Sequence, residues 1–144
     1  MRSDGANSDA ADARPQGEQS CLATAIYFEA RGESTKGQKA VAEVILTRER
    51  TAGRPKTICG VVYEGADHSG CQFSFACDGV PDRITDEAAW LRAERVATVV
   101  MLTHDRKNPV ARGATYYHAN YVRPNWASHM IKVAQIGTHI FYRP

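Results

Sequence analysis

The sequence predicts an α+β domain that is predominantly α-helical. Three stretches between residues 20 and 104 carry apolar residues at helical spacing. Shorter stretches between residues 114 and 142 are rich in β-branched and aromatic residues, as strands are. Because 144 residues suffice for one core, we expect these helices and a small β-hairpin region to form a single domain.

Composition excludes several classes of protein. No apolar run approaches the ~18 residues of a membrane-spanning helix, and no signal-peptide pattern opens the chain. Residues 1–19 carry two basic and four acidic side chains without a periodic apolar pattern, so we expect a disordered N-terminal tail there. The formal charge of +2 then leaves residues 20–144 at +4, without the clustered basic face of a nucleic-acid-binding protein.

The first predicted helix places a carboxylate where burial is expected. Ser20 is a candidate N-cap, and one face of the helix carries Leu22, Ala25, Ile26 and Glu29. Gly32 is a candidate helix stop, which puts Glu29 in the last turn. Burial and the negative end of the helix dipole both favour a protonated carboxyl group, so Glu29 is a candidate general acid.

Two other interpretations concern the carboxylates of this segment. Glu29 can instead form a structural ion pair with Arg31 or another basic side chain, because such pairs also perturb pKa values. Glu33 lies beyond Gly32, and we expect it to favour the N-terminus of the following helix.

The next elements follow from caps and apolar spacing. Thr35 and Gln38 have the spacing of a capping box, and the helix that they begin should end near Arg50. Its apolar stripe, opposite Lys39, Glu43 and Glu49, consists of Ala40, Val41, Val44 and Ile45. A short helical turn is expected within residues 57–63.

A long loop rich in Gly, Asp and Cys is expected over residues 64–83. Such loops in small domains are usually either functional or disordered. We expect Phe73 and Phe75 to fill the core, whereas Gln72 and Ser74 alternate with them and should face a ligand.

The last elements are a long helix and short strands. Asp86 is the candidate N-cap of a helix that should end near His104 and serve as the central scaffold, with Trp90 packed against the core. Residues 114–119 and 131–142 should form strands, the second stretch as a hairpin interrupted at Gly137.

Four cysteines permit one or two disulfides, and three full pairings exist among Cys21, Cys59, Cys71 and Cys77. Disulfides would indicate an oxidising compartment. One alternative is a zinc site at His68, Cys71 and Cys77, although the paired Cys-x2-Cys spacing is missing. Another is that Cys21, near a helix N-terminus, is a nucleophile with His118 as its base.

Six separated motifs go beyond these general patterns. They begin at Cys21, Gly37, Ile58, Cys71, Tyr117 and Ile136, and read CLATAIYFEARGE, GQKAVAEV, ICGVVY, CQFSF, YHA and IGTHIFY. In this order they resemble the cell-wall hydrolase family typified by the spore cortex-lytic enzyme SleB, within the lysozyme-like superfamily. The resemblance covers residues 20–143.

The resemblance implies a lysozyme-like catalytic domain over residues 20–144. Its reaction would cleave peptidoglycan between N-acetylmuramic acid and N-acetylglucosamine by a lytic transglycosylase route, leaving a 1,6-anhydromuramoyl end. The family's catalytic glutamate matches Glu29, which would act first as general acid and then as base. Muramidase-type hydrolysis stays open, although ordinary glycosidases use two carboxylates and Glu33 is the one obvious second candidate.

Several side chains are candidate substrate contacts in such an enzyme. Polar groups that can bind the acetamido sugars belong to Glu33, Gln72, Ser74, Tyr117 and His118, and rings that can stack on them belong to Tyr27, Tyr116 and Trp126. Core packing is the alternative for these side chains, and we expect His139 to be a structural histidine. The expected partner is the peptidoglycan polysaccharide, bound by a monomer without metal or cofactor.

The chain also departs from the spore enzymes. No stretch of this sequence resembles their separate peptidoglycan-binding domain, so we do not expect a spore-specific role to carry over. Its cysteines resemble those of members from Gram-negative bacteria, which favours a periplasmic or extracellular location that is reached by a route not visible in this sequence. Two alternatives remain, a peptidase or amidase that uses Cys21 or Cys59 with His118, and a non-catalytic wall-binding module.

Overall fold

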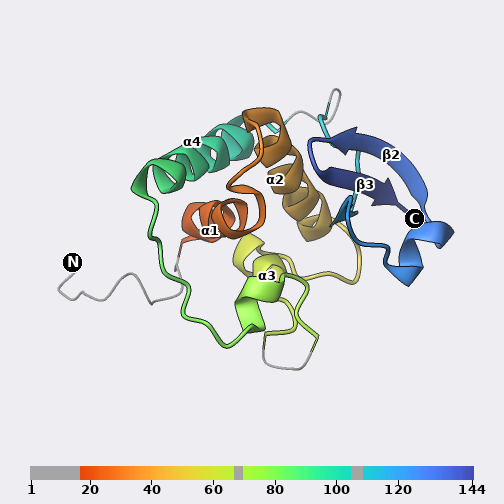
Figure 1. Ribbon diagram of the computed structural model, residues 1–144, viewed down its shortest axis with the longest axis horizontal. Coiled ribbons are helices and arrows are strands. Elements are labelled where there is room, and N and C mark those ends of the chain that lie inside the picture. The colour runs from red at the N-terminus through yellow and green to blue at the C-terminus, as the bar shows by residue number, and fades with distance from the viewer. Residues whose placement is uncertain (1–16, 67–69, 105–108) are drawn as a thin grey trace.

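The computed structural model describes residues 17–66, 70–104 and 109–144. Its α-helices are α1 (Glu18–Ala30), α2 (Thr35–Glu49), α3 (Ile58–Val62) and α4 (Glu87–Thr103). Its strands are β1 (Tyr116–Ala119), β2 (Ile131–Ile136) and β3 (His139–Arg143), and 3-10 helices cover Ser74–Cys77 and Asn125–His129. The predominantly helical α+β architecture is therefore confirmed (Figure 1).

Helix α1 lies at the centre of the helical part and contacts α2, α3 and α4 (Figure 1). It carries apolar residues around almost its whole circumference, with Leu22, Ala23 and Ile26 fully buried, which is the pattern of a helix enclosed by others. The prediction that the helix after Asp86 is the central scaffold was wrong. Helix α4 buries one stripe and leaves Leu102 79% exposed on its other side.

The start of α1 differs from the sequence prediction. The helix begins at Glu18 after Gly17, rather than after Ser20. The Glu18 carboxylate accepts hydrogen bonds from the backbone N–H groups of Ile58 and Cys59, at 2.5 and 3.1 Å, and so joins α1 to the start of α3. The prediction of a disordered tail is therefore wrong for Glu18 and Gln19, which belong to α1, and residues 1–16 of that prediction lie outside the described residues.

The predicted N-cap of α4 at Asp86 is confirmed, whereas the predicted cap of α2 is not, and α3 has a cap that was not predicted. Thr57 and Asp86 accept backbone hydrogen bonds at the N-termini of α3 and α4. Helix α2 is capped by Ser34, which accepts from the Gly37 N–H at 3.1 Å, and not by Thr35. Gln38 is buried and donates to the Ala30 carbonyl at 3.1 Å, which holds the end of α1 against α2.

Two disulfides join the four cysteines. Cys21–Cys59 links α1 to α3, and Cys71–Cys77 closes a short loop around the first 3-10 helix. Within that loop Phe73 and Phe75 are buried, as predicted, and form part of the hydrophobic core.

The three strands form an antiparallel sheet in the order β1-β3-β2, beside α2 in Figure 1. The predicted hairpin joins β2 to β3 through Gly137, whose φ of 59° favours glycine. The Glu33 carboxylate accepts hydrogen bonds from Thr138 in this turn, at 3.2 Å from N and 2.6 Å from Oγ1. The connection between α1 and α2 thus holds the hairpin, and with it the sheet.

No helix within the described ranges combines the length and the apolar content that crossing a membrane requires.

Candidate active site

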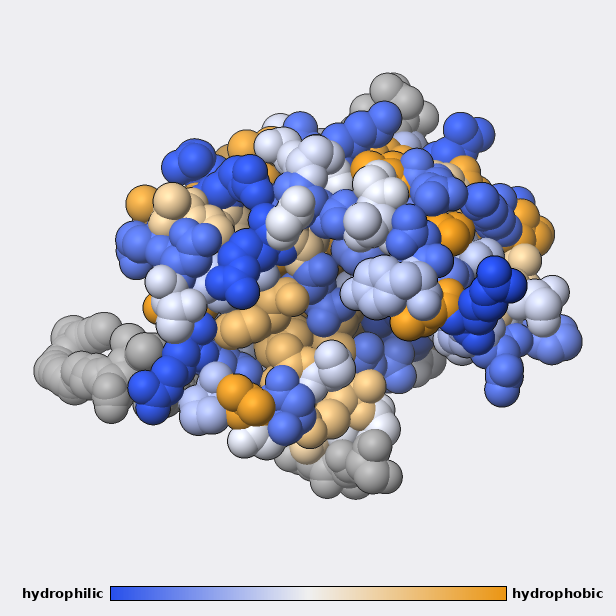
Figure 2. Space-filling model, in the orientation of Figure 1, coloured by the Kyte–Doolittle hydropathy of each residue, from blue (hydrophilic) through white to orange (hydrophobic). Residues whose placement is uncertain are grey.

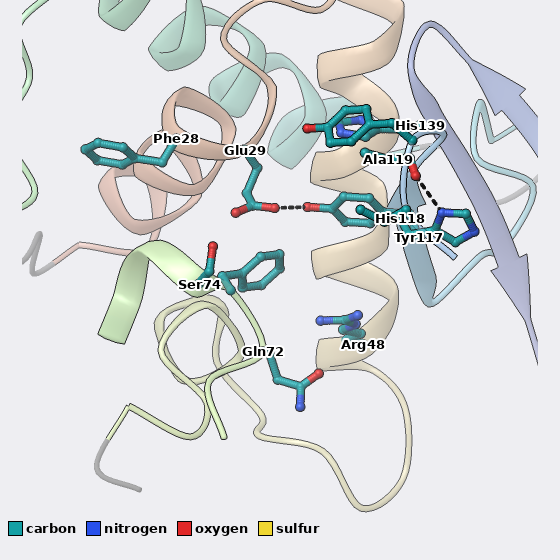
Figure 3. A pocket seen from close by; sticks show the side chains of 12 residues that line it. Phe28, Glu29, Arg48, Gln72, Ser74, Tyr117, His118, Ala119 and His139 are labelled. Atoms are coloured by element: carbon teal, nitrogen blue, oxygen red, sulfur yellow. Dashed lines mark hydrogen bonds between the residues drawn. The ribbon is translucent and has the colours of Figure 1, made fainter. Parts of the chain in front are cut away.

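An open cleft of about 360 Å³ lies between the end of α1, helix α2, the loop closed by Cys71–Cys77, and the sheet. Its lining comprises Phe28, Glu29, Arg48, Gln72, Phe73, Ser74, Tyr117, His118, Ala119, Tyr121, Val122 and His139. Figure 2 shows a hollow near the middle of one face, where apolar side chains lie among hydrophilic ones. Figure 3 shows side chains of the cleft converging from these separate elements.

Glu29 reaches the cleft from the last turn of α1, as its spacing predicted. Its Oε1 accepts a hydrogen bond from the Tyr117 hydroxyl at 2.5 Å, and its Oε2 makes no hydrogen bond with the described residues (Figure 3). Burial raises the pKa of Glu29, although the Tyr117 hydrogen bond and the positive charge of Arg48 oppose this effect. One carboxyl oxygen is thus fixed, and the other is left for a ligand.

Tyr117 is held in the state that this hydrogen bond requires. Burial raises its pKa well above the usual value, and the neighbouring Glu29 acts in the same direction. The phenol therefore stays protonated at neutral pH, and its hydroxyl donates to Glu29 Oε1. The ring packs against His139 and Phe141 of β3, at centroid distances of 4.9 and 5.6 Å, which fixes its direction.

The alternative ion pair between Glu29 and Arg31 is not formed. Arg31 is exposed, donates a hydrogen bond to the Tyr27 hydroxyl, and lies 4.4 Å from the centroid of the Tyr27 ring. Tyr27 itself is 1% exposed and accepts hydrogen bonds from the N–H groups of Thr85 and Asp86, so it is a core residue rather than a platform for a sugar.

His118 lies in the cleft with a defined tautomer. Its Nδ1 lies 2.7 Å from the Ala119 carbonyl, which can only accept, so Nδ1 carries a proton. Its Nε2 lies 2.8 Å from the Tyr142 hydroxyl and accepts from it in the neutral ring. The ring also stacks on Tyr142 at 5.2 Å, so the sheet holds His118 in one orientation.

The cleft brings together most of the predicted site residues. Glu29, Gln72, Ser74, Tyr117 and His118 all line it. Gln72 and Ser74 are exposed whereas Phe73 and Phe75 are buried, so the predicted alternation along this loop is confirmed.

Besides Tyr27, three predicted substrate contacts lie outside the cleft lining among the described residues. Tyr116 and Trp126 pack against each other at 5.4 Å in an aromatic cluster beside the cleft, and neither lines it. Glu33 also lies outside the lining, because its carboxylate is engaged by Thr138. Glu29 is therefore the one carboxylate among the described lining residues.

Several lining residues were missed by the sequence reasoning. His139, expected to be structural, is 7% exposed and lines the cleft; burial lowers its pKa, so the ring is neutral. Arg48 is 5% exposed and follows Val44 and Ile45 at helical spacing on the buried stripe of α2. A charged residue on an apolar stripe is the same signal that identified Glu29, and it could have identified Arg48. No periodic signal marks Tyr121, which comes from the loop after β1.

The alternatives that need free thiolates are contradicted. Cys21 and Cys59 form one disulfide and Cys71 and Cys77 the other, so none of them is available as a nucleophile or a zinc ligand. His68, the third residue of the considered zinc site, lies outside the described residues.

Comparison with known proteins gives a family match for most of the chain. Residues 32–142 match the model of a family described as Cell Wall Hydrolase. The chain is similar to the spore cortex-lytic enzymes of Oceanobacillus iheyensis, 31% identical over 121 residues, and Bacillus subtilis, 30% identical over 120 residues. Each comparison covers 83% of this chain but only 39% and 35% of the respective enzyme, so the chain spans little more than a third of these relatives.

Solved structures give the same result for the fold. The catalytic domain of the germination-specific lytic transglycosylase SleB from Bacillus anthracis superposes with a TM-score of 0.69 at 27% identity, covering 90% of this chain and 96% of that domain. The catalytic domain of Bacillus cereus SleB superposes with a TM-score of 0.64 at 26% identity, covering 96% of this chain and the whole of that domain. The domain that the sequence predicted to be lysozyme-like therefore has a fold like that of SleB catalytic domains.

Proposed function

Because this chain belongs to the cell wall hydrolase family, we propose that it cleaves the glycan strand of peptidoglycan between N-acetylmuramic acid and N-acetylglucosamine, as a lytic transglycosylase. The observation that carries the proposal is Glu29, a single carboxyl group with a raised pKa, held by a neutral phenol at an open cleft. The likeness to a catalytic domain described as a lytic transglycosylase supports the type of reaction.

Glu29 serves both halves of this reaction through Oε2. In the first half its carboxyl proton moves to the glycosidic oxygen as the bond from that oxygen to C1 of the muramic residue breaks. In the second half the carboxylate takes the proton of the C6 hydroxyl as that oxygen bonds to C1. The 1,6-anhydro ring closes, Glu29 regains its proton, and no water is consumed.

The arrangement of carboxylates favours this route over hydrolysis. Retaining and inverting glycosidases place two carboxyl groups on either side of the bond. Here Glu29 is the one carboxylate among the described lining residues, and Glu33 is occupied by Thr138. An internal hydroxyl nucleophile needs only one group to act as acid and then base.

The remaining polar groups of the cleft are assigned to substrate binding. Gln72 and Ser74 are exposed along one wall and can exchange hydrogen bonds with the acetamido groups. His118 lines the opposite wall, and the exposed ring of Tyr121 offers a face for a pyranose at its edge.

We also propose that the protein works outside the cytoplasm, in the periplasm or at the cell surface, because its substrate lies there and disulfides persist in such compartments.

The test is product analysis with a matched pair of variants. Purified peptidoglycan is incubated with wild type, with Glu29→Gln and with Glu87→Gln, and soluble products are analysed by mass spectrometry with and without borohydride reduction. Glu87 is an exposed residue in the first turn of α4, outside the cleft lining, and controls for the loss of a carboxylate. We expect wild type and Glu87→Gln to release products that resist reduction, and Glu29→Gln to release none.

Other outcomes separate the competing functions. Reducible muramic ends that depend on Glu29 would mean hydrolysis at the same bond. Freed peptides with intact glycan, or full activity of Glu29→Gln, would contradict the proposal. Retention of the protein on peptidoglycan without any release of products would point to a wall-binding module.

A further inference from the structure

We propose that Arg48 binds a carboxylate of the peptidoglycan strand beside the bond that Glu29 cleaves. This inference rests on the proposed function, because it names the part of that substrate which the cleft recognises. It concerns a residue that the proposed chemistry of Glu29 does not require.

The Arg48 guanidinium is fixed in position at the C-terminal end of α2. Its Nε donates a hydrogen bond to the Thr115 carbonyl at 2.7 Å. The rings of Phe73 and Tyr116 lie 5.4 and 5.6 Å from its Cζ, within the range of cation–π contacts. With the residue 5% exposed, the fork of N–H groups is held in place before any ligand arrives.

The positive charge of this guanidinium is not matched by a nearby carboxylate. None of the described carboxylates lies within 4.0 Å of Arg48, and its Nη1 is buried without a hydrogen-bond partner. Glu64, which contributes some negative charge, is paired with Arg54 at 3.0 Å. Because a buried cation is costly unless it is paired, an anionic ligand is the partner that this arrangement lacks.

A carboxylate fits these donors better than a neutral oxygen does. Two carboxylate oxygens match the planar fork of a guanidinium, and hydrogen bonds between opposite charges are stronger than neutral ones. Arg54 lies near enough to lower the pKa of Arg48, but its own charge is paired with Glu64, so Arg48 is the guanidinium that the ligand would engage.

Arg48 lies in the same cleft as Glu29, and Figure 3 places it with Gln72 on one side of the Glu29–Tyr117 pair and His139 on the other. The sugar backbone of peptidoglycan is neutral. Its carboxylates belong to the muramic residues, either as the free lactyl group or on the attached peptide. A carboxylate at Arg48 would therefore set which sugar lies next to Glu29, and would separate peptidoglycan from a neutral chain of acetamido sugars.

The experiment compares cleavage rates on matched strands. One portion of soluble glycan strands keeps its carboxylates, and another has them converted to neutral amides with carbodiimide and methylamine. We expect wild type to cleave the first at least about tenfold faster, as for the loss of one hydrogen-bonded charge. For Arg48→Met the ratio of the two rates should fall to near one, and for Arg48→Lys it should be intermediate.

This ratio distinguishes recognition from a purely structural role of Arg48. A variant that is partly unfolded, or whose Glu29 has a changed pKa, loses activity equally on both substrates, so its ratio does not move. Arg92→Met is the matched control. Arg92 donates to the carbonyls of Arg31 and Glu33, at 2.9 and 3.2 Å, and does not line the cleft, so its variant should keep the wild-type ratio.

Further arms identify the source of the carboxylate. Strands stripped of peptide by an amidase expose the lactyl carboxylate, which is amide-linked wherever a peptide is attached. Faster cleavage of stripped strands would therefore assign the lactyl group, and faster cleavage of intact strands would assign a peptide carboxylate. A further test needs no Arg48 variant and applies even if neither variant folds. Inhibition of wild type by free N-acetylmuramic acid, but not by N-acetylglucosamine, would support the proposal. Equal inhibition by the two sugars would overturn it.

The outcomes also separate this inference from the proposed function. Equal wild-type rates on charged and amidated strands, with products that still resist borohydride, would overturn the role of Arg48 and leave the function of Glu29 intact. The wild-type ratio persisting in Arg48→Met would do the same. Release of peptides with intact glycan would overturn both.

Discussion

Replacing Tyr117 with phenylalanine tests how the acid is controlled. The change removes the hydroxyl that donates to Glu29 Oε1 at 2.5 Å and keeps the ring that packs on β3. Because this hydrogen bond favours the charged carboxylate, its loss should raise the pKa of Glu29 further. If Glu29 must be protonated to begin the reaction, kcat/KM falls as pH rises through that pKa, so the alkaline limb of the pH profile should move upward.

The size of the movement follows from the hydrogen bond. A bond to a charged group contributes about 1.5–3 kcal/mol, and about 1.4 kcal/mol corresponds to one pH unit, so the limb should move up by about one to two units. The acidic plateau should fall at the same time, by about tenfold, because the carboxyl group is a weaker acid and is no longer fixed by its partner.

The assay is the initial rate of peptidoglycan solubilisation from pH 4 to pH 9 for wild type, Tyr117→Phe and Tyr116→Phe. Tyr116→Phe removes the same hydroxyl from the adjacent residue, which does not contact Glu29, and its limb should stay where wild type has it. An alkaline limb that is unchanged or lower in Tyr117→Phe would refute the reasoning about the Glu29 pKa.

Two further predictions concern stability. Glu29→Gln should raise Tm relative to wild type at pH 7 but not at pH 4. The raised pKa of Glu29 means that the folded wild type loses stability as pH rises above the unfolded value, and the amide does not; equal differences at both pH values would contradict this. Removing the Cys21–Cys59 disulfide, whose sequence separation is 38, should cost about 4 kcal/mol by loop entropy, against about 2 kcal/mol for Cys71–Cys77 with a separation of 6. Denaturant unfolding of the two double Cys→Ser variants measures both, and equal losses would show that loop length does not decide them.

Much of the fold follows from local rules that the sequence displays. Apolar spacing and caps located α2, α3 and α4 to within a residue or two, and Gly137 located the hairpin. The same spacing located Glu29, because a carboxylate on an apolar stripe of a helix must be accommodated by its surroundings. These signals are short-range, because each depends only on residues that are neighbours in the sequence.

The rest depends on which distant elements meet. Glu43 was predicted on the polar face of α2, yet it is 8% exposed and its carboxylate accepts from the N–H groups of Val110 and Ala111. Nothing in the spacing of α2 shows that a loop 67 residues away needs an acceptor there. The choice of α4 as the scaffold failed for a related reason, because local periodicity does not reveal how many neighbours a helix has.

Glu33 illustrates how a residue can matter for the chemistry without lying at the cleft. It stands in the same motif as Glu29, which made it the natural second carboxylate, but its oxygens hold Thr138 in the turn between β2 and β3. Strand β3 pairs with β1 so that Phe141 lies opposite Tyr117, and Tyr117 donates to Glu29. One carboxylate of the motif therefore meets the cleft, while the other fixes the sheet that supplies the donor for the first. The pKa of the acid is thus a property of the assembled fold, because burial raises it and a hydrogen bond from a strand 88 residues away in sequence opposes that rise.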